Sequence, residues 1–252
     1  MAFLQVQFYS KALHVASTVN VILPEADQGV GVKGRGSRKL PRVLYLLHGY
    51  SDDHSIWMRR TSVERYAADH NLCVVMPAVN HSFYCNEPYG ENYWEYVSEE
   101  LPAVMHKFFR LSDKPKDTFV AGLSMGGYGA MKLALTYPER FAAAGSFSGA
   151  VDIAHLAESD NAMTKRLFLE PMKVAGSDDD LFHLLEKNAD APHKPQLLVA
   201  CGTADYLYGA HQKLVPALLK HNWPVHGQDT PGATHEWGYW DAMIKQFIEE
   251  FC

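Results

Sequence analysis

Short apolar segments rich in β-branched residues alternate with helical patterns along nearly the whole of this 252-residue chain. From Val43 onward these segments are continuously apolar, which is typical of parallel strands that helices cover on both faces. The alternation therefore predicts an α/β fold with a mostly parallel sheet of about eight strands and right-handed crossovers. We expect strands near residues 3–9, 18–24, 42–48, 72–77, 117–123, 142–147, 196–201 and 224–229, the first two antiparallel, and helices near residues 55–70, 93–110, 125–137, 178–189, 209–221 and 237–250.

One segment, from about residue 152 to 192, is longer than a plain crossover requires and is mixed in character. We interpret it as a small helical, cap-like insertion over one end of the sheet, within a single domain that spans residues 1–252. Its acidic run, Asp178-Asp179-Asp180, is more typical of a helix N-terminus than of a metal site, because carboxylates stabilise the first helical turn.

Composition and charge weigh against several classes of function. The net charge of −6 gives no electrostatic reason to expect nucleic acid or an anionic membrane surface as a partner. No window approaches the roughly 18 apolar residues of a membrane span, and the N-terminus lacks the pattern of a signal peptide. The four cysteines form no C-x-x-C pair, so we expect free thiols and a cytoplasmic location.

The segment Gly122–Gly126 reads Gly-Leu-Ser-Met-Gly and matches the G-x-S-x-G pattern. A β-type segment, Thr118–Ala121, precedes it, and a helical segment follows until Pro138. A serine on a tight strand-to-helix turn projects its Oγ out of the sheet, and the crowded turn favours glycine on both sides. We therefore predict that Ser124 is a catalytic nucleophile rather than part of a plain glycine-rich helix start.

A serine nucleophile needs a base within hydrogen-bond reach, and the base needs an orienting acceptor. When the serine lies on such a turn, the chain order is Ser, then Asp or Glu, then His, on loops at the carboxyl ends of strands. Asp205 meets this demand because it follows the strand expected at 196–201, which Gly202 ends. A turn or N-cap role is the alternative for Asp205, and Asp152 is its chief competitor as the acid.

The predicted base is His235, on the loop between the last expected strand and the last expected helix. It is the only one of the 13 histidines in a glycine-containing loop of this kind. His226 precedes it within the strand itself and is less suitably placed. His48, at the end of an earlier strand, is predicted to hold its loop rather than to act as a base or a metal ligand.

An oxyanion hole requires backbone N–H donors aimed at the charge that develops on the carbonyl oxygen. The turn itself offers the N–H of Met125, and we predict that the loop after the third strand offers the N–H of Tyr50. Together with Ser124, His235 and Asp205, these donors complete an acyl-transfer site that needs no metal and no organic cofactor. We predict that Trp57, Tyr50 and residues of 152–190 form part of the wall of a limited acyl pocket.

With these residues in view, the chain resembles the esterase D-like group of α/β-hydrolases, and within it the small tributyrin-esterase type of bacterial carboxylesterase. The resemblance implies an α/β-hydrolase fold, the triad proposed above, hydrolysis of short-chain acyl esters and a cytoplasmic location. The matching pieces are spread over most of the chain and comprise Leu46–Gly49 with Trp57, Glu99–Pro102, Ala121–Ala130, Cys201–Asp205, and Gly232–Trp237 with Tyr239 and Trp240.

The wider group also contains S-formylglutathione hydrolases, feruloyl and acetylxylan esterases and mycolyltransferases. S-formylglutathione hydrolases typically have a Ser-Gly-Leu-Thr-Cys type of loop where this chain has His48–Asp52, and a histidine where Leu123 stands. Both departures favour an ordinary ester over a thioester as substrate. An acyltransferase with the same triad and an inactive hydrolase-fold binding protein are the remaining alternatives.

The expected partner is a small ester, and a homo-oligomer is also considered. Three tryptophans near the C-terminus are candidates for a subunit contact, or equally for core or pocket wall: Trp223, Trp237 and Trp240.

Overall fold

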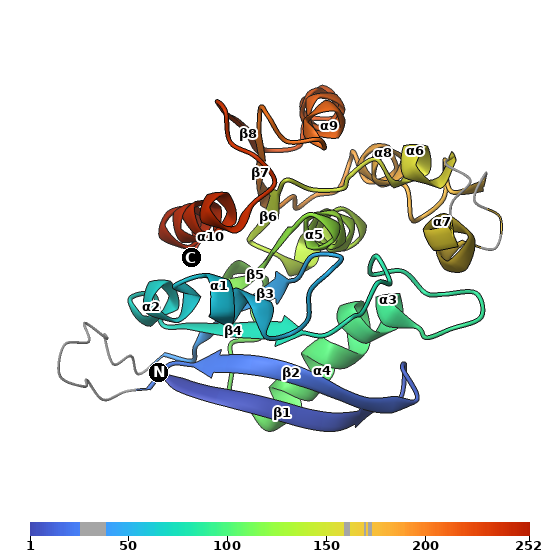
Figure 1. Ribbon diagram of the computed structural model, residues 1–252. Coiled ribbons are helices and arrows are strands. Elements are labelled where there is room, and N and C mark those ends of the chain that lie inside the picture. The colour runs from blue at the N-terminus through green and yellow to red at the C-terminus, as the bar shows by residue number, and fades with distance from the viewer. Residues whose placement is uncertain (26–38, 159–161, 169, 171–172) are drawn as a thin grey trace.

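The computed structural model describes residues 1–25, 39–158, 162–168, 170 and 173–252. At its centre is one eight-stranded sheet in the order β1-β2-β4-β3-β5-β6-β7-β8 (Figure 1). Strands β1 and β2 pair antiparallel, β2 pairs antiparallel with β4, and every other pair is parallel. The predicted mostly parallel α/β fold is thereby confirmed. The strands are Ala2–Ser10 (β1), Val15–Leu23 (β2), Arg42–Leu47 (β3), Leu72–Pro77 (β4), Thr118–Leu123 (β5), Ala143–Phe147 (β6), Gln196–Gly202 (β7) and Val225–Thr230 (β8).

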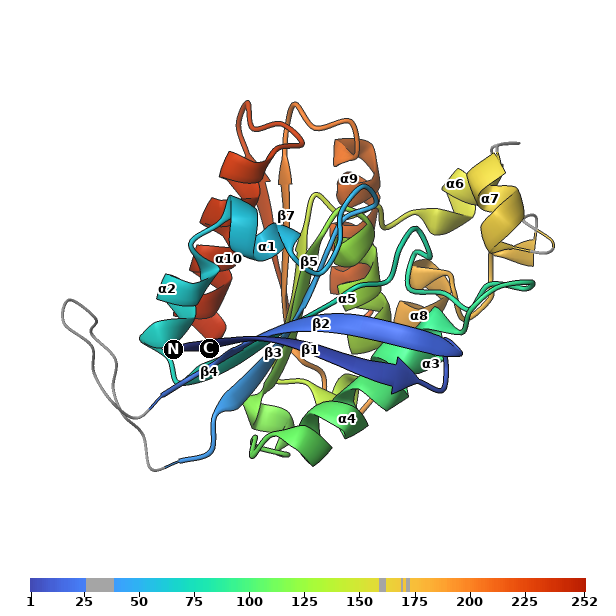
Figure 2. The same ribbon diagram turned by 60° about the horizontal axis from the view of Figure 1, so that its bottom comes forward.

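Helices cover both faces of the sheet, as Figure 2 shows from the side. Helices α1, α2 and α10 cover one face, and their buried side chains form one apolar cluster with that face of the strands. Helices α4, α5, α8 and α9 cover the other face and form the second cluster. The inner strands β3, β4, β5, β6 and β7 are buried along nearly their whole length because helices pack against each face of the sheet there. These helices are Ile56–Arg60 (α1), Val63–Ala68 (α2), Leu101–Phe108 (α4), Met125–Thr136 (α5), Leu181–Lys187 (α8), Tyr208–Lys220 (α9) and Trp237–Phe251 (α10).

The helix expected at 55–70 is in fact two short helices, α1 and α2, with a break at Thr61 and Ser62. Thr61 is extended, and its hydroxyl donates to the carbonyl of Trp57 at 2.6 Å. The Ser62 N–H donates to the Asp241 carboxylate of α10 at 3.0 Å. The Thr61 N–H still makes its helical bond to Trp57 O, whereas at Ser62 a side-chain acceptor replaces the helical one.

The helix expected at 93–110 contains a π-helical turn, Tyr96–Glu100, between α3 (Tyr93–Glu95) and α4. Pro102 near the start of α4 has no N–H to donate to the carbonyl of Ser98. Arg140 satisfies that carbonyl instead, through its Nη1 at 2.9 Å. The irregular turn therefore has an identifiable partner outside the helix.

The predicted insertion contains α6 (Ile153–Glu158), α7 (Ala162–Leu167) and also α8, and α6 and α7 lie at the side of the molecule, away from the sheet (Figure 2). Residues 159–161, 169 and 171–172 of it lie outside the described residues. Buried side chains of α6 and α7 join the apolar cluster around α5. That the segment acts as a cap remains a prediction.

The turn between β5 and α5 places Ser124 at φ 51° and ψ −118°, a conformation that side chains rarely adopt. Glycines on either side make the turn compact. A Cβ at Gly122 would overlap the backbone of Gly126, and a Cβ at Gly126 would overlap the carbonyl oxygens of Leu47 and His48. The helix and the end of β3 can approach this closely only because Gly126 has no side chain.

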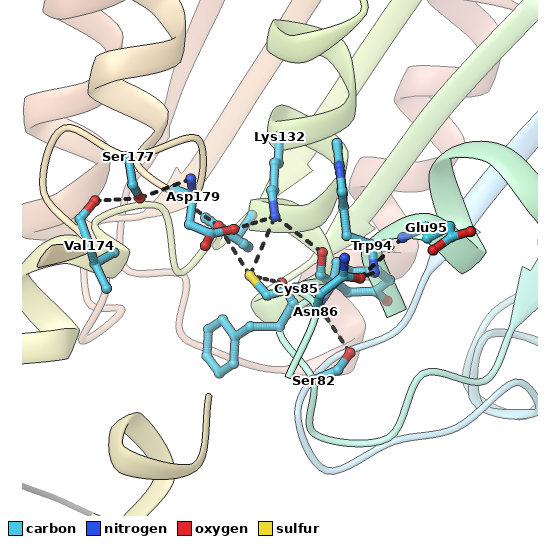
Figure 3. Close-up of polar contacts among 12 residues, drawn as sticks. Ser82, Cys85, Asn86, Trp94, Glu95, Lys132, Val174, Ser177 and Asp179 are labelled. Carbon is cyan, nitrogen blue, oxygen red and sulfur yellow. Dashed lines mark hydrogen bonds and ion pairs between the residues drawn. The ribbon is translucent and has the colours of Figure 1, made fainter. Parts of the chain in front are cut away.

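A buried cation lies on the same helix. Lys132 is 2% exposed, and its Nζ lies 2.5 Å from the Asp179 carboxylate, 3.4 Å from the Cys85 sulfur and 3.4 Å from the Tyr84 carbonyl oxygen (Figure 3). It also lies 4.2 Å from the centre of the Trp94 ring. Burial alone would lower the pKa of Lys132, but these anionic and polar partners raise it above its ordinary value.

We predict that Gly126→Ala destabilises the protein by about 3 kcal/mol, since a methyl group there meets backbone atoms that cannot rotate away. Gly209→Ala is the matched control, because nothing lies within 4 Å of a Cβ at this position in α9. Alanine at 209 should be neutral or stabilising by up to about 1 kcal/mol. Denaturant unfolding measures both, and equal effects of the two substitutions would refute this account of the turn.

We predict that Lys132→Met costs roughly 3 kcal/mol of stability, because Asp179 loses the partner of its buried ion pair. The pKa of Asp179 lies below its ordinary value, which the partner Lys132 causes against the effect of burial. The pair therefore stabilises the fold above the unfolded pKa of the carboxyl group, and this contribution is lost as the pH falls below about 4.

Lys187→Met is the control for that substitution. Lys187 pairs with Asp178 at a similar distance, 2.6 Å, but both side chains are largely exposed. Its loss should cost less than about 1 kcal/mol. Thermal or urea unfolding of the two variants at neutral and acidic pH makes the comparison, and a Lys132→Met protein as stable as Lys187→Met would contradict it.

Candidate active site

Three loops that follow strands β5, β7 and β8 meet at the carboxyl edge of the sheet, and each carries one predicted catalytic residue. Ser124 follows β5, Asp205 follows β7, and His235 follows β8. Parallel strands end at the same edge, so residues more than a hundred positions apart become neighbours.

Ser124 lies between the end of β5 and the N-terminus of α5. Its N–H donates to Phe147 O at 2.9 Å, and its carbonyl accepts from the N–H groups of Tyr128 and Ala150 at 3.1 and 3.0 Å. The side chain makes no capping hydrogen bond to the helix, so its hydroxyl is left for the pocket. The residue as a whole is 8% exposed.

Asp205 and His235 are in direct contact. The imidazole Nδ1 lies 2.8 Å from Asp205 Oδ2, and the other carboxylate oxygen accepts from Leu207 N–H at 2.9 Å. Burial alone would raise the pKa of Asp205, but these hydrogen bonds and one from Ser148 lower it below its ordinary value. The carboxylate therefore stays ionised and holds the imidazole with its Nε2 side free for chemistry.

Aromatic rings enclose the His235 imidazole. The Tyr206 ring lies 4.6 Å from it, and the Trp240 ring lies 4.8 Å from it, edge-on. Trp240 is fixed in turn by a hydrogen bond from its Nε1 to the Ser148 hydroxyl at 3.2 Å. Burial and the nearby Asp205 raise the pKa of Tyr206. The hydrogen bond between its hydroxyl and the Ser124 side chain acts in the opposite direction.

Ser124 and His235 line the same pocket, a cavity of about 470 Å³. The hydrogen bonds among the described residues do not include one between the Ser124 hydroxyl and the imidazole. Catalytic hydrogen bonds of this kind are often long without substrate and tighten when it binds. The full lining consists of Gly49, Tyr50, Ser51, Asp52, Leu123, Ser124, Tyr206, His235, Glu236, Trp237 and Trp240.

The predicted oxyanion donors flank the serine. Met125 is the first residue of α5, where N–H groups have no partner within the helix. Tyr50 follows Gly49, whose Cβ position lies 3.7 Å from Ser124 Cβ, so this loop lies beside the nucleophile. Among the hydrogen bonds of the described chain, neither the Tyr50 nor the Met125 N–H has an acceptor.

His48 holds the loop that contains Gly49 and Tyr50 in place through hydrogen bonds at both ring nitrogens. Its Nε2 accepts from the Val79 N–H at 3.0 Å, so the proton lies on Nδ1, which donates to Gly49 O at 2.7 Å. The side chain is 1% exposed, and burial lowers the pKa of His48 to about 4. A neutral imidazole that uses both nitrogens cannot serve as the base.

The competing candidates are engaged elsewhere. Asp152 accepts from His155 N–H and pairs with Lys213 at 2.7 Å. His226 lies in the edge strand β8, with its Nδ1 3.8 Å from Glu250. Neither contacts the Asp205–His235 pair.

Trp57 is not placed in the wall of this pocket. It is 1% exposed, donates from its Nε1 to Leu47 O at 3.0 Å, and packs edge-on against Trp237, which does line the pocket. Of the other two C-terminal tryptophans, Trp223 is 2% exposed and Trp240 is 5% exposed. These two therefore serve the core and the pocket wall of the chain itself.

Sequence reasoning missed three residues of the site. Ser148, at φ 47°, hydrogen-bonds both Asp205 and Trp240, and no local pattern marks it. Tyr206 directly follows Asp205, the predicted acid, and this position next to a site residue is the sequence signal that could have identified it. Asp52 follows the predicted oxyanion loop and lines the pocket.

No three His, Cys, Asp or Glu residues in the described ranges are grouped so that they could hold a metal ion. None of the helices in these ranges combines the length and apolar character that crossing a lipid bilayer requires.

Comparison with known proteins agrees with this geometry. A family model described as "Putative esterase" matches residues 10–251. An acetyl esterase from Caldicellulosiruptor saccharolyticus is 29% identical over 260 residues, which cover 99% of this chain and 97% of that protein.

Two solved structures from Staphylococcus aureus are also similar. The substrate-bound fluorophosphonate-binding serine hydrolase F (FphF) has a TM-score of 0.88 and is 37% identical. The S-formylglutathione hydrolase FrmB has a TM-score of 0.85 and is 36% identical. Each comparison covers 98% of this chain and 97% of the other. The chain therefore belongs to this esterase family, and it is a serine-type carboxylic ester hydrolase on an α/β-hydrolase fold.

Proposed function

We propose that this chain hydrolyses short-chain acyl esters through an acyl-enzyme formed on Ser124, with His235 as base and Asp205 as the orienting carboxylate. The observation that carries the proposal is the 2.8 Å contact between Asp205 and His235, whose imidazole lines the same pocket as Ser124. Similarity to an acetyl esterase along the whole chain supports a small acyl group.

In the first half of the reaction, Ser124 Oγ attacks the acyl carbonyl carbon while His235 Nε2 takes the hydroxyl proton. The carbonyl oxygen becomes an oxyanion, which the N–H groups of Met125 and Tyr50 stabilise. Collapse of this intermediate breaks the ester bond, and His235 gives its proton to the leaving alcohol. Asp205 stabilises the imidazolium throughout by accepting from Nδ1.

In the second half, His235 removes a proton from water as the water oxygen attacks the acyl carbon. The carbon–Oγ bond breaks, Ser124 recovers its proton from His235, and the carboxylic acid leaves. The same donors hold the second oxyanion. The tyrosine ring of Tyr206 shields one side of the imidazole during both steps.

A thioester substrate is the second candidate, because similarity to an S-formylglutathione hydrolase extends over nearly the whole chain. Feruloyl and acetylated-xylan substrates have no comparable support, since two feruloyl esterases of similar structure are only 22% and 18% identical to this chain. An acyltransferase would use the same triad, so product analysis with a competing alcohol separates it from a hydrolase. An inactive binding role has little support, because the contact between acid and base is intact.

A cytoplasmic location and a homo-oligomer remain predictions. All four cysteines are free and buried, which suits a reducing compartment. The burial of Trp223 and Trp240 within the chain removes two of the three side chains that suggested a subunit contact. The tributyrin-esterase type likewise remains a prediction, which a series of p-nitrophenyl esters of rising acyl length tests.

We predict that Ser124→Ala lowers turnover of p-nitrophenyl acetate by about 10⁶-fold and that Asp205→Asn lowers it by about 10⁴-fold. The first removes the nucleophile, and the second leaves the imidazole without its anionic partner. Steady-state kinetics measure both effects. A fluorophosphonate probe should label the wild-type chain and leave the Ser124→Ala variant unlabelled.

Two variants serve as controls. They replace Asp152 and His226, which the sequence offers as alternatives to the acid and the base but which lie elsewhere in the fold. Asp152→Asn and His226→Gln should retain near-normal turnover. Near-normal turnover in Ser124→Ala, or a collapse of turnover in either control, would show that the reaction uses different residues.

A further inference from the structure

The charges around the pocket are one-sided. Two carboxylates, Asp52 and Glu236, contribute to its lining beside His235, and among the residues that the structure describes the lining contains no lysine or arginine. Glu236 is already engaged as the N-cap of α10, where its two oxygens accept from the N–H groups of Gly238 and Tyr239 at 2.8 and 2.9 Å. Asp52 is therefore the carboxylate with the greater capacity to meet a ligand.

Asp52 lies close to the reacting atoms. A Cβ built on Gly49 would lie 2.9 Å from Asp52 Oδ2 and 3.7 Å from Ser124 Cβ. The carboxylate and the nucleophile therefore lie on either side of the same glycine. Asp52 is half-buried, and burial raises its pKa, while the Gly49 N–H, Arg60 and His235 act in the opposite direction. A partly desolvated carboxylate acts on nearby charges more strongly than one in bulk water.

Aromatic rings form much of the remaining wall. Tyr206 is 75% exposed and Tyr50 is 37% exposed, while Trp237 and Trp240 pack edge-on with ring centres 5.1 Å apart. Aromatic faces attract cations through their quadrupole, and quaternary ammonium groups are recognised by such walls. The aromatic rings and the Asp52 carboxylate therefore both favour a positively charged ligand.

We infer that this pocket prefers esters whose alcohol portion carries an ammonium group over uncharged esters, that it disfavours anionic ones, and that Asp52 is the residue that determines this preference. The inference rests on the proposed function, because it assumes that Ser124 attacks an ester bound in this pocket. It weighs against glutathione thioesters, which carry two carboxylates and one ammonium group and so are anionic overall.

Three acetate esters test the preference with the purified full chain at pH 8, where carboxylates are ionised. Acetylcholine carries the cation, 3,3-dimethylbutyl acetate is its uncharged isostere, and the acetate ester of 3-hydroxypropanesulfonate carries an anion. We expect kcat/KM for acetylcholine to exceed that for the isostere by about tenfold at low salt and to exceed it less at high salt. The sulfonate should be the poorest of the three.

Asp52→Asn should bring the ratio of acetylcholine to isostere near one, because it removes the charge and keeps the shape. Asp53→Asn is the matched control with the same change in net charge. The Asp53 carboxylate accepts from the Ser55 N–H and hydroxyl at 2.8 and 2.7 Å and lies outside the pocket lining, so the ratio should persist.

A second measurement needs no variant. Choline should inhibit hydrolysis of the uncharged ester by the wild-type chain about tenfold more strongly than 3,3-dimethylbutanol does. Equal inhibition by the two alcohols, or a wild-type ratio near one for the two esters, would overturn the inference, as would an Asp52→Asn protein that keeps the preference.

The neutral ester separates this inference from the function on which it rests. If the wild-type chain hydrolyses 3,3-dimethylbutyl acetate and Ser124→Ala does not, the proposed function holds, and the charge ratio alone decides the role of Asp52. If none of the three esters is hydrolysed in a Ser124-dependent way, the proposed function fails, and the inference fails with it.

Discussion

The backbone at Ser124 is held in a conformation that costs free energy, and it persists because its surroundings over-determine it. Its N–H and carbonyl are both fixed by neighbouring backbone, at Phe147 on one side and at Tyr128 and Ala150 on the other. The hydroxyl then has one direction open to it, toward the pocket. Asp205 and His235 lie near Ser124 because the strands that precede all three residues end at the same edge of the sheet.

The rigidity continues away from the nucleophile. The Tyr84 hydroxyl donates to His48 O at 3.0 Å, while its ring fills the space that a Cβ at Gly129 would need. Lys132 donates to the carbonyl of Tyr84 from the same helix (Figure 3). Tyr84 thus links helix α5, which begins beside Ser124, to the loop that carries Tyr50, the proposed oxyanion donor. Such second-layer contacts keep reacting groups within the narrow geometry that acyl transfer requires.

The sequence predicts best where a local pattern and a physical demand coincide. All eight strands lie within a few residues of their expected positions. Continuous apolar segments such as β3 and β4 have few alternatives in an α/β fold, and β1 shows the alternation of a half-buried strand. The loops of Asp205 and His235 could be selected because strand ends and chain order restrict them. The break at Ser62 could not, since its acceptor is Asp241, 179 residues away in the chain.

The same reasoning explains the residues of the site that were missed or misplaced. Ser148 supports the acid only because β6 lies beside β7, a relation that no window of sequence contains. Trp57 is predicted to form part of the pocket wall, but its indole donates to the buried carbonyl of Leu47 and lies behind Trp237, which does line the pocket. Local patterns identify groups that react, whereas neighbours that orient them are fixed by tertiary packing.

Similarity over the whole chain does not carry every property equally. Ser124, Asp205 and His235 directly follow strands that helices cover, whereas binding surfaces on loops vary more readily between proteins of one fold. The leaving group meets side chains on the loops, such as Asp52 and Tyr206. A carboxylate beside the nucleophile repels an anionic leaving group both in the bound substrate and in the transition state. The charge of Asp52 on the loop after β3 therefore bears more directly than whole-chain similarity on the choice between an ordinary ester and a glutathione thioester as substrate.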